Sequence, residues 1–151
     1  MLSHKVLTRQ DVGDAAGYYE DGADDYYAQE GEASAWQGKG AEALGLTGAV
    51  DSKRFRELLS GEVQPGIAIT RDGTRKDSKS RLGIDLTFSA PKSVSLQALI
   101  GGDVEIIKAH DRAVARALEH AEERAQARKK VDGRSQVETT GNLVVAKFRH
   151  E

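Results

Sequence analysis

The residues best suited to chemistry are the tyrosines, which occur as two adjacent pairs within ten residues. They are the only four in the sequence: Tyr18, Tyr19, Tyr26 and Tyr27. A tyrosine hydroxyl can act as a nucleophile, but its ordinary pKa of about 10 means that it needs a base, a metal or a cationic environment to do so. One such pair would indicate aromatic packing, whereas two pairs so close together favour a catalytic hypothesis.

Helical periodicity separates the members of the first pair. An apolar stripe at positions i, i+3, i+4 and i+7 predicts a helix, and it consists of Val12, Ala15, Ala16 and Tyr19. Tyr18 lies about 100° away from Tyr19 around this helix, so its hydroxyl can reach an open site. Gly22 interrupts the helix, and the periodicity therefore leaves the geometry of Tyr26 and Tyr27 open.

The acidic surroundings of the tyrosines indicate that positive charge must come from elsewhere. Residues 11–32 carry eight Asp or Glu side chains and no Lys or Arg. Neighbouring negative charge raises the pKa of a tyrosine instead of lowering it. A divalent metal is the usual source of the charge that activates such a hydroxyl and neutralises an attacked phosphate.

Asp85 and His150 are the candidates for supporting a metal. Asp85 lies within an otherwise apolar strand pattern, on the face opposite its apolar side chains. A carboxylate there either holds a metal-ligating histidine in the correct tautomer or is a solvated acid of the sheet surface. His150 follows a second apolar strand pattern, but the other histidines show no ligand spacing. From these residues alone the metal site is incomplete.

The distribution of charge favours a nucleic-acid partner although the net charge is −2. Because the acids are concentrated in residues 11–32, the rest of the chain carries +6. Residues 71–92 hold six Lys or Arg and three Asp, which fits either a basic wall of a groove or an ordinary solvated loop. The candidate DNA contacts are Arg75, Arg81 and Lys92. Trp36 is either a base-stacking residue or, as we expect, a core residue.

The composition indicates a globular domain of the cytoplasm. Hydrophobic residues make up 38% and charged residues 30% of the chain, proportions typical of folded proteins. The absence of cysteine excludes disulfides and suits a reducing compartment. No stretch approaches the roughly 18 apolar residues of a membrane helix, so no membrane insertion is expected.

The order of the expected elements predicts an α+β fold, with helices packed on an antiparallel sheet. We expect strands at residues 1–8, 82–88 and 136–149, and helices that begin near Thr8, Asp51, Pro91 and residue 103. The last helix is expected to reach residue 130, with Lys129 and Lys130 at its C-terminal end. Residues 31–50 are expected to form turns with a short strand or hairpin, and residues 61–80 a loop.

Four segments of the chain carry a resemblance to a known family. They are Met-Leu-Ser-His-Lys-Val-Leu-Thr-Arg-Gln-Asp at the start, the tyrosine segment, Gly-Ile-Asp-Leu-Thr-Phe-Ser-Ala-Pro-Lys-Ser-Val-Ser at 83–95, and Gly-Asn-Leu-Val-Val-Ala-Lys-Phe-Arg-His-Glu at 141–151. Together they resemble the conjugative relaxases of the MobF class, the TrwC/TraI type. The resemblance implies a palm-like antiparallel sheet with flanking helices. It also implies an enzyme that binds a hairpin and adjoining single strand at a plasmid transfer origin.

The resemblance implies a role for each candidate residue. In this family a tyrosine attacks the scissile phosphate, leaving a 5′-phosphotyrosine and a free 3′-hydroxyl. Tyr18 matches the tyrosine of the first cut and Tyr26 one that serves the later strand transfer. Asp85 matches the acid that orients a ligand histidine, and His150 the first of three histidines that bind a divalent metal such as Mg or Mn. Relaxosome accessory proteins and a coupling protein are the implied protein partners.

The other two histidines of the family lie in a downstream His-x-His element that this chain does not contain. Residues 1–151 are therefore expected to be the N-terminal portion of a relaxase domain about twice as long. We expect little metal binding and no nicking by these residues alone.

Three other functions stay open at this point. A rolling-circle replication initiator shares the tyrosine and histidine chemistry. A non-catalytic module for single-stranded nucleic acid or for protein would use the tyrosines as stacking platforms. A regulatory fragment would compete with the intact enzyme for DNA.

Overall fold

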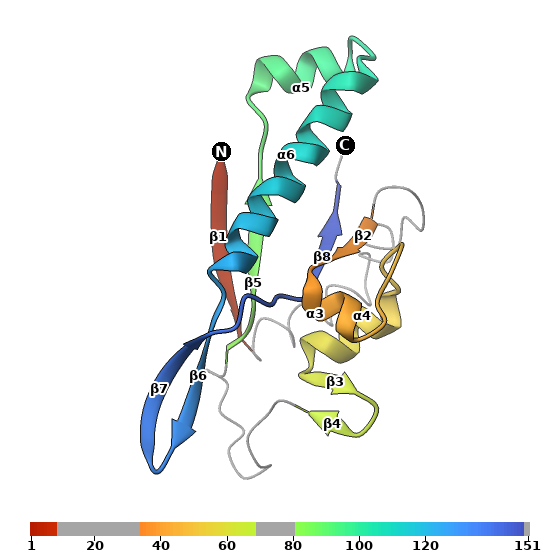
Figure 1. Ribbon diagram of the computed structural model, residues 1–151. Helices are drawn as coiled ribbons and strands as arrows, with labels where there is room; N and C mark the ends of the chain where they lie inside the picture. Colours follow the sequence, from red (N-terminus) through yellow and green to blue (C-terminus); the bar gives the residue numbers. More distant parts are fainter. Residues whose placement is uncertain (9–33, 69–80, 150–151) are drawn as a thin grey trace. The chain divides into compact units, whose positions relative to one another are not determined.

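The computed structural model describes residues 1–8, 34–68 and 81–149 (Figure 1). The chain forms two compact units. The first comprises Met1–Ala35, Gly48–Ser89 and Phe148–His150, and the second Trp36–Thr47, Ala90–Lys147 and Glu151. The predicted helix that carries the first tyrosine pair lies outside the described residues.

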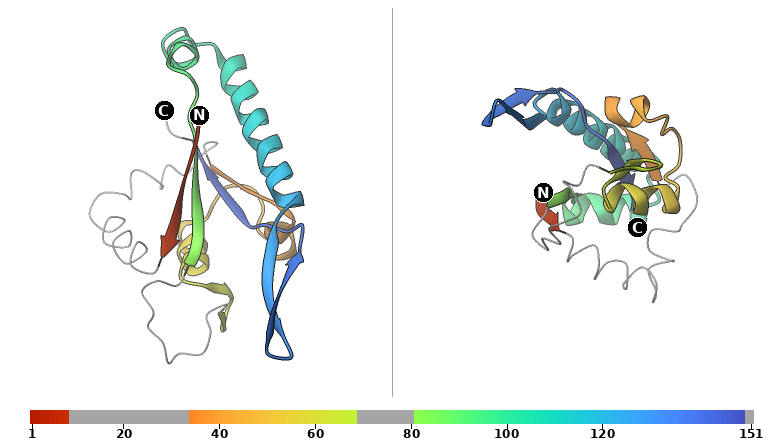
Figure 2. Two further views of the ribbon diagram at one scale, coloured as in Figure 1. Left: turned by 90° about the vertical axis from the view of Figure 1, so that its left-hand side faces the viewer. Right: turned by 90° about the horizontal axis from the view of Figure 1, so that it is seen from below.

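An antiparallel strand pair is the main sheet of the first unit. It consists of β1 (Leu2–Thr8) and β5 (Arg81–Phe88), which lie side by side in Figures 1 and 2. Leu2 pairs with Phe88 and Leu7 with Gly83, before the register shifts at Thr8. The strands predicted at 1–8 and 82–88 are confirmed. The period-2 alternation places Leu2, Val6 and the apolar side chains of β5 on one face, and Leu7 on the other.

The helix predicted after Asp51 is also confirmed in the first unit. It is α4 (Ser52–Leu59), and the Asp51 carboxylate accepts a 2.7 Å hydrogen bond from the Arg54 backbone N–H. The expected loop at 61–80 is wrong for its first residues, which form the hairpin of β3 (Glu62–Gln64) and β4 (Ile67–Ala68). Pro65-Gly66 is the turn, and Gly66 has a φ of 77°, as the third position of a type II turn requires.

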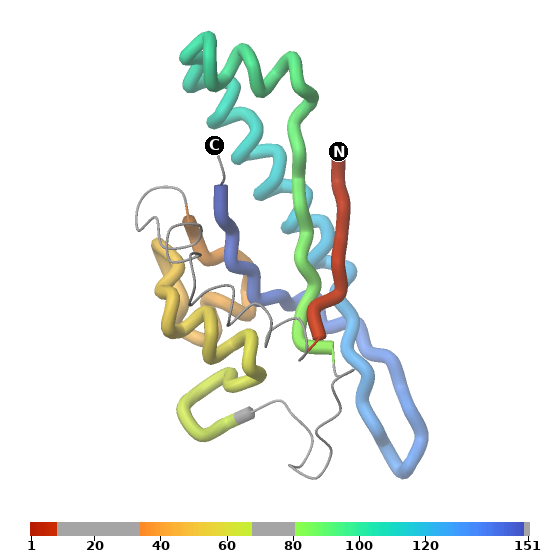
Figure 3. The backbone as a smooth tube through the Cα atoms, turned by 180° about the vertical axis from the view of Figure 1, so that it is seen from behind, coloured from red at the N-terminus to blue at the C-terminus, as the bar shows by residue number. Residues whose placement is uncertain are grey.

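Helices dominate the second unit, and Figure 3 shows two of them joined end to end by a tight turn. They are α3 (Lys39–Ala43), α5 (Lys92–Leu99) and α6 (Val104–Glu123). Pro91 is the N-cap of α5, so this helix begins one residue after the predicted start, and Asp103 caps α6 at the predicted place. The five-residue α3 was not predicted, since residues 31–50 were expected to form turns with a short strand or hairpin.

Buried side chains of the described residues concentrate on the faces of these helices. The buried ones are Ala41, Ala98, Leu118 and Glu122. Leu118 and Glu122 are one turn apart on α6, so they share a face. Burial of one leucine side chain contributes about 2 kcal/mol, whereas a buried carboxylate needs hydrogen-bond donors.

The prediction that the last helix reaches residue 130 is wrong. Residues after Glu123 form β6 (Gln126–Val131) and β7 (Arg134–Thr139), an antiparallel ribbon of six residue pairs. Asp132 and Gly133 have φ values of 49° and 76°, the conformation that a two-residue hairpin turn requires. Lys129 and Lys130 therefore lie on a strand and not at a helix end.

The strand predicted at 136–149 is divided in two. Its first part belongs to β7 and its second is β8 (Val145–Phe148), because the chain turns at Gly141, which has a φ of 58°. β8 pairs with β2 (Ser34–Gln37), in which Trp36 is half-buried, so its expected core role stays a prediction. The described elements confirm the α+β class. No helix among them is long and apolar enough to cross a membrane.

Candidate nucleic-acid interface

Asp85 lies at the centre of β5 with an exposed side chain. Its partner across the antiparallel ladder is Lys5 of β1, whose side chain is also exposed. Opposite charges in such cross-strand pairs contribute roughly 0.2–1 kcal/mol. The ladder thus fixes the backbone beneath Asp85, while its carboxylate stays accessible to a further group.

The basic residues predicted to contact DNA that the structure describes belong to different units. Arg81 is the first residue of β5 in the first unit, Lys92 is the first residue of α5 in the second, and both are exposed. Arg75 lies outside the described residues.

The remaining predicted site residues also lie outside the described residues. They are Tyr18, Tyr19, Tyr26, Tyr27 and His150. Within the described ranges no three His, Asp or Glu side chains lie close enough together to bind a metal. These ranges therefore do not by themselves supply a ligand set. Within the first unit the ring of Phe148 packs edge-on against that of Phe55, with 5.2 Å between their centroids.

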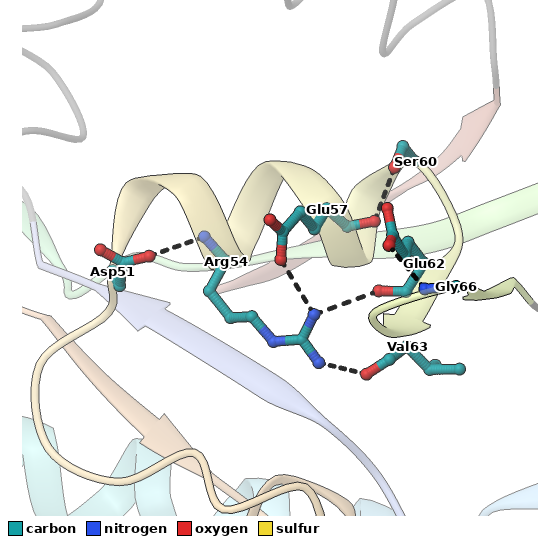
Figure 4. A network of polar contacts seen from close by, with 7 residues as sticks. All are labelled: Asp51, Arg54, Glu57, Ser60, Glu62, Val63 and Gly66. Atoms are coloured by element: carbon teal, nitrogen blue, oxygen red, sulfur yellow. Dashed lines mark hydrogen bonds and ion pairs between the residues drawn. The ribbon is translucent and has the colours of Figure 1, made fainter.

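Arg54 of α4 contacts the β3–β4 hairpin, which precedes the predicted DNA contact Arg75 in the sequence. Its guanidinium donates hydrogen bonds to the Glu57 carboxylate at 3.1 Å, to the Glu62 carbonyl at 3.4 Å and to the Val63 carbonyl (Figure 4). The Glu62 carboxylate in turn accepts from the Gly66 backbone N–H at 3.1 Å. We call these contacts the Arg54 network. They hold the β3–β4 hairpin against the end of α4.

The β6–β7 ribbon (Gln126–Thr139) is a basic surface that sequence reasoning missed. It carries four cationic and two acidic side chains, all exposed, and it extends away from the end of α6 in Figure 2. The cations are Arg128, Lys129, Lys130 and Arg134. The register places Arg128 and Lys130 on one face and Lys129 and Arg134 on the other. The Asp-Gly dipeptide between the basic run of residues 128–130 and Arg134 is the turn signal that could have revealed it.

The sequence of the chain matches known proteins along its length. A family model described as TrwC relaxase matches residues 12–151. The multifunctional conjugation protein TraI of Escherichia coli is 45% identical over 153 aligned positions, which cover the whole of this chain and 8% of TraI.

Solved structures extend the match to three dimensions. A metal-bound structure of conjugative relaxase TrwC in complex with oriT DNA is 72% identical, with a TM-score of 0.84 over 100% of this chain and 51% of that one. TrwC complexed with a 27-mer DNA comprising the recognition hairpin and the cleavage site is 66% identical, with a TM-score of 0.82 over 100% of this chain and 49% of that one. The chain thus spans about half the length of these solved relatives.

Proposed function

Because the chain belongs to the TrwC relaxase family, we propose that it forms part of a conjugative relaxase that cuts and later rejoins one DNA strand at a plasmid transfer origin. The observation that carries this proposal is the 72% identity and 0.84 TM-score to a relaxase solved with oriT DNA, which extend over all of the chain. The exposed cations of the β6–β7 ribbon, together with the exposed Arg81 and Lys92, support a DNA partner. The proposal covers the activity of the longer protein to which such a chain contributes.

In the proposed reaction the Tyr18 hydroxyl oxygen attacks the scissile phosphorus. A tyrosine–phosphate bond forms, the bond to the 3′-oxygen breaks, and the 3′-oxygen leaves and takes up a proton, while the tyrosine proton passes to a base or to water. One phosphodiester replaces another, so the step reverses without ATP. Tyr26 is proposed to serve the later strand transfer, with Tyr19 and Tyr27 completing the two pairs.

A metal requirement is part of the proposal. A divalent cation, Mg²⁺ or Mn²⁺, would bind with His150 among its ligands and supply positive charge at the attacked phosphate. Asp85 is proposed to orient a ligand histidine, and its exposed position on β5 is compatible with that task.

The DNA contacts are proposed to come from two kinds of basic surface. Arg75, Arg81 and Lys92 would neutralise phosphates along the single strand and fix its position without specifying sequence. The β6–β7 ribbon would contact the hairpin stem, because a two-stranded ribbon fits the major groove and its cations lie on both faces. Relaxosome proteins, a coupling protein and a cytoplasmic location belong to the same proposal.

The test is formation of a covalent protein–DNA adduct. The intact protein that carries this chain is mixed with a single strand of its plasmid's transfer origin and a divalent metal, and adducts that survive a denaturing gel are counted. We expect an adduct with the unsubstituted protein and none with Tyr18→Phe, because that change removes only the hydroxyl.

Binding of the same strand by Tyr18→Phe, measured without denaturation, is the control for folding. An adduct that persists in Tyr18→Phe would exclude Tyr18 as the nucleophile of the first cut. Unsubstituted protein that binds DNA but forms no adduct with any metal would favour a non-catalytic binding module.

A further inference from the structure

Glu122 joins three segments of the second unit that are far apart in sequence. Its Oε1 accepts a 2.8 Å hydrogen bond from the Lys39 N–H, at the first residue of α3, and a 2.9 Å hydrogen bond from the Leu143 N–H, between β7 and β8. Only 8% of Glu122 is exposed. The N-cap of α3, Gly38, supplies no side-chain acceptor, so Glu122 provides the acceptor that this helix end lacks.

The backbone around Glu122 leaves no room for additional atoms. The Gly40 N–H donates to the Leu143 carbonyl at 2.9 Å. A Cβ at Gly40 would lie 2.6 Å from the Asn142 Oδ1 and 2.7 Å from the Leu143 carbonyl oxygen. This close approach is what allows one carboxylate oxygen to reach two backbone amides at once.

These contacts lie at the base of the β6–β7 ribbon. The ribbon begins four residues after Glu122 and ends four residues before Leu143. At the same place the Ala125 carbonyl accepts from the Thr140 N–H at 2.8 Å and the Thr140 hydroxyl at 3.2 Å. Beyond this base every ribbon side chain except the half-buried Val131 is exposed, so the base determines the direction in which the cations point.

We propose that Glu122 is a positioning residue for DNA recognition, which acts by fixing the base of the β6–β7 ribbon so that its cations meet the phosphates of a hairpin stem. This proposal rests on the proposed function, because it requires that the ribbon contacts DNA. Glu122 itself touches no DNA in it. Its two acceptor bonds set the orientation of side chains six to twelve residues away in sequence.

The experiment measures DNA affinity of the intact protein for two oligonucleotides as a function of salt. One is the single strand of the transfer origin with its inverted repeat, and the other has one arm of the repeat scrambled so that no hairpin forms. Glu122→Ala removes the acceptor, whereas Glu122→Gln keeps an acceptor oxygen. Glu123→Ala is the matched control, because it removes the same charge from the adjacent position, which is 64% exposed and outside the ribbon base.

We expect Glu122→Ala to weaken hairpin binding about tenfold relative to Glu123→Ala, and to change binding of the scrambled strand little. Fewer ribbon cations would then contact phosphates. The negative slope of log affinity against log salt should therefore decrease in magnitude by about two to four. Glu122→Gln should restore most of the affinity and the slope.

Two outcomes would overturn the positioning role. The first is a Glu122→Ala protein that binds the hairpin with unchanged affinity and slope. The second is an equal loss of affinity for both oligonucleotides with an unchanged salt slope. Partial unfolding would give this result, because it lowers the fraction of active protein without altering the DNA contacts of the molecules that stay folded. Failure of the unsubstituted protein to prefer the hairpin would instead refute the ribbon's part in the proposed function, which distinguishes the two failures.

Discussion

Two hairpins of this chain are each held at the base by one charged side chain, but with opposite charges and over very different distances in sequence. Arg54 donates to carbonyls eight and nine residues ahead, whereas Glu122 accepts from amides 83 and 21 residues away. The Arg54 side chain is 18% exposed and paired with Glu57, while Glu122 is more deeply buried and is held by backbone amides.

This difference shows that a hairpin can be held at its base either by local contacts or by non-local ones. The Arg54 network needs only α4 and the hairpin that follows it, so it can form as soon as those residues fold. The Glu122 contacts need α3, α6 and the segment after β7 to be in place together. Substitutions at the Glu122 site should therefore affect all three of these segments, and those at Arg54 only one corner of the first unit.

The largest expected effect comes from filling the space beside Leu143. Gly40→Ala places a Cβ within 2.8 Å of three atoms and should lower the free energy of unfolding by about 3 kcal/mol, measured by urea denaturation. Gly83→Ala is the control, because its Cβ would meet only the Leu7 Cδ1 at 4.0 Å. Equal midpoints for the two variants would show that the base of the ribbon is not tightly packed.

A smaller loss is expected at the local corner. Arg54→Ala removes donors to two carbonyls that water can partly replace, so we expect about 1.5 kcal/mol of destabilisation in the same assay. Lys53→Ala, an exposed neighbour on α4, should change little. If Arg54→Ala lowered the free energy of unfolding more than Gly40→Ala does, the local contacts would be the more important ones, contrary to our expectation.

Removal of a helix N-cap should lower the free energy of unfolding by the same amount in both units. Asp51→Ala and Asp103→Ala each remove a carboxylate that accepts from helix N-terminal amides, and each should cost about 1 kcal/mol by urea denaturation. The cap is a local feature in both cases, so its cost should not depend on the non-local contacts of the unit. Costs that differ several-fold between the two would contradict this reasoning.

The smallest effect is expected at an exposed ion pair of α6. The hydrogen bond and charge of Glu119 raise the pKa of Arg116, which is fully solvated. Because this pKa is raised in the folded state, the stabilisation by the pair is fully present below the ordinary pKa of arginine and is lost only above it. The pair therefore adds no pH dependence to the free energy of unfolding between about pH 6 and about pH 9. Arg116→Ala should leave the urea midpoint unchanged across that range, since solvent screens the pair. A midpoint shift that varies with pH would refute this.

Much of the fold was predictable where the signal is local. The alternation in residues 82–88 predicted β5, and the cap at Asp51 predicted the start of α4, which the structure confirms. The β6–β7 ribbon was missed because Lys129 and Lys130 also suit a helix end, and the Asp132-Gly133 turn outweighs that preference. Of the site residues, those in the described ranges are Asp85, Arg81 and Lys92, and the structure shows all three exposed.

The sequence by itself determined the α+β class and the candidate tyrosines, because adjacent pairs, alternation and caps are properties of neighbouring residues, and four of its segments carried the resemblance to the family. Only the tertiary structure decided that Glu122 joins Lys39 to Leu143 and that the basic run after α6 stands exposed on a ribbon. The physical reason is that a buried carboxylate must find donors, and its donors here come from segments whose separation in sequence hides their proximity in space.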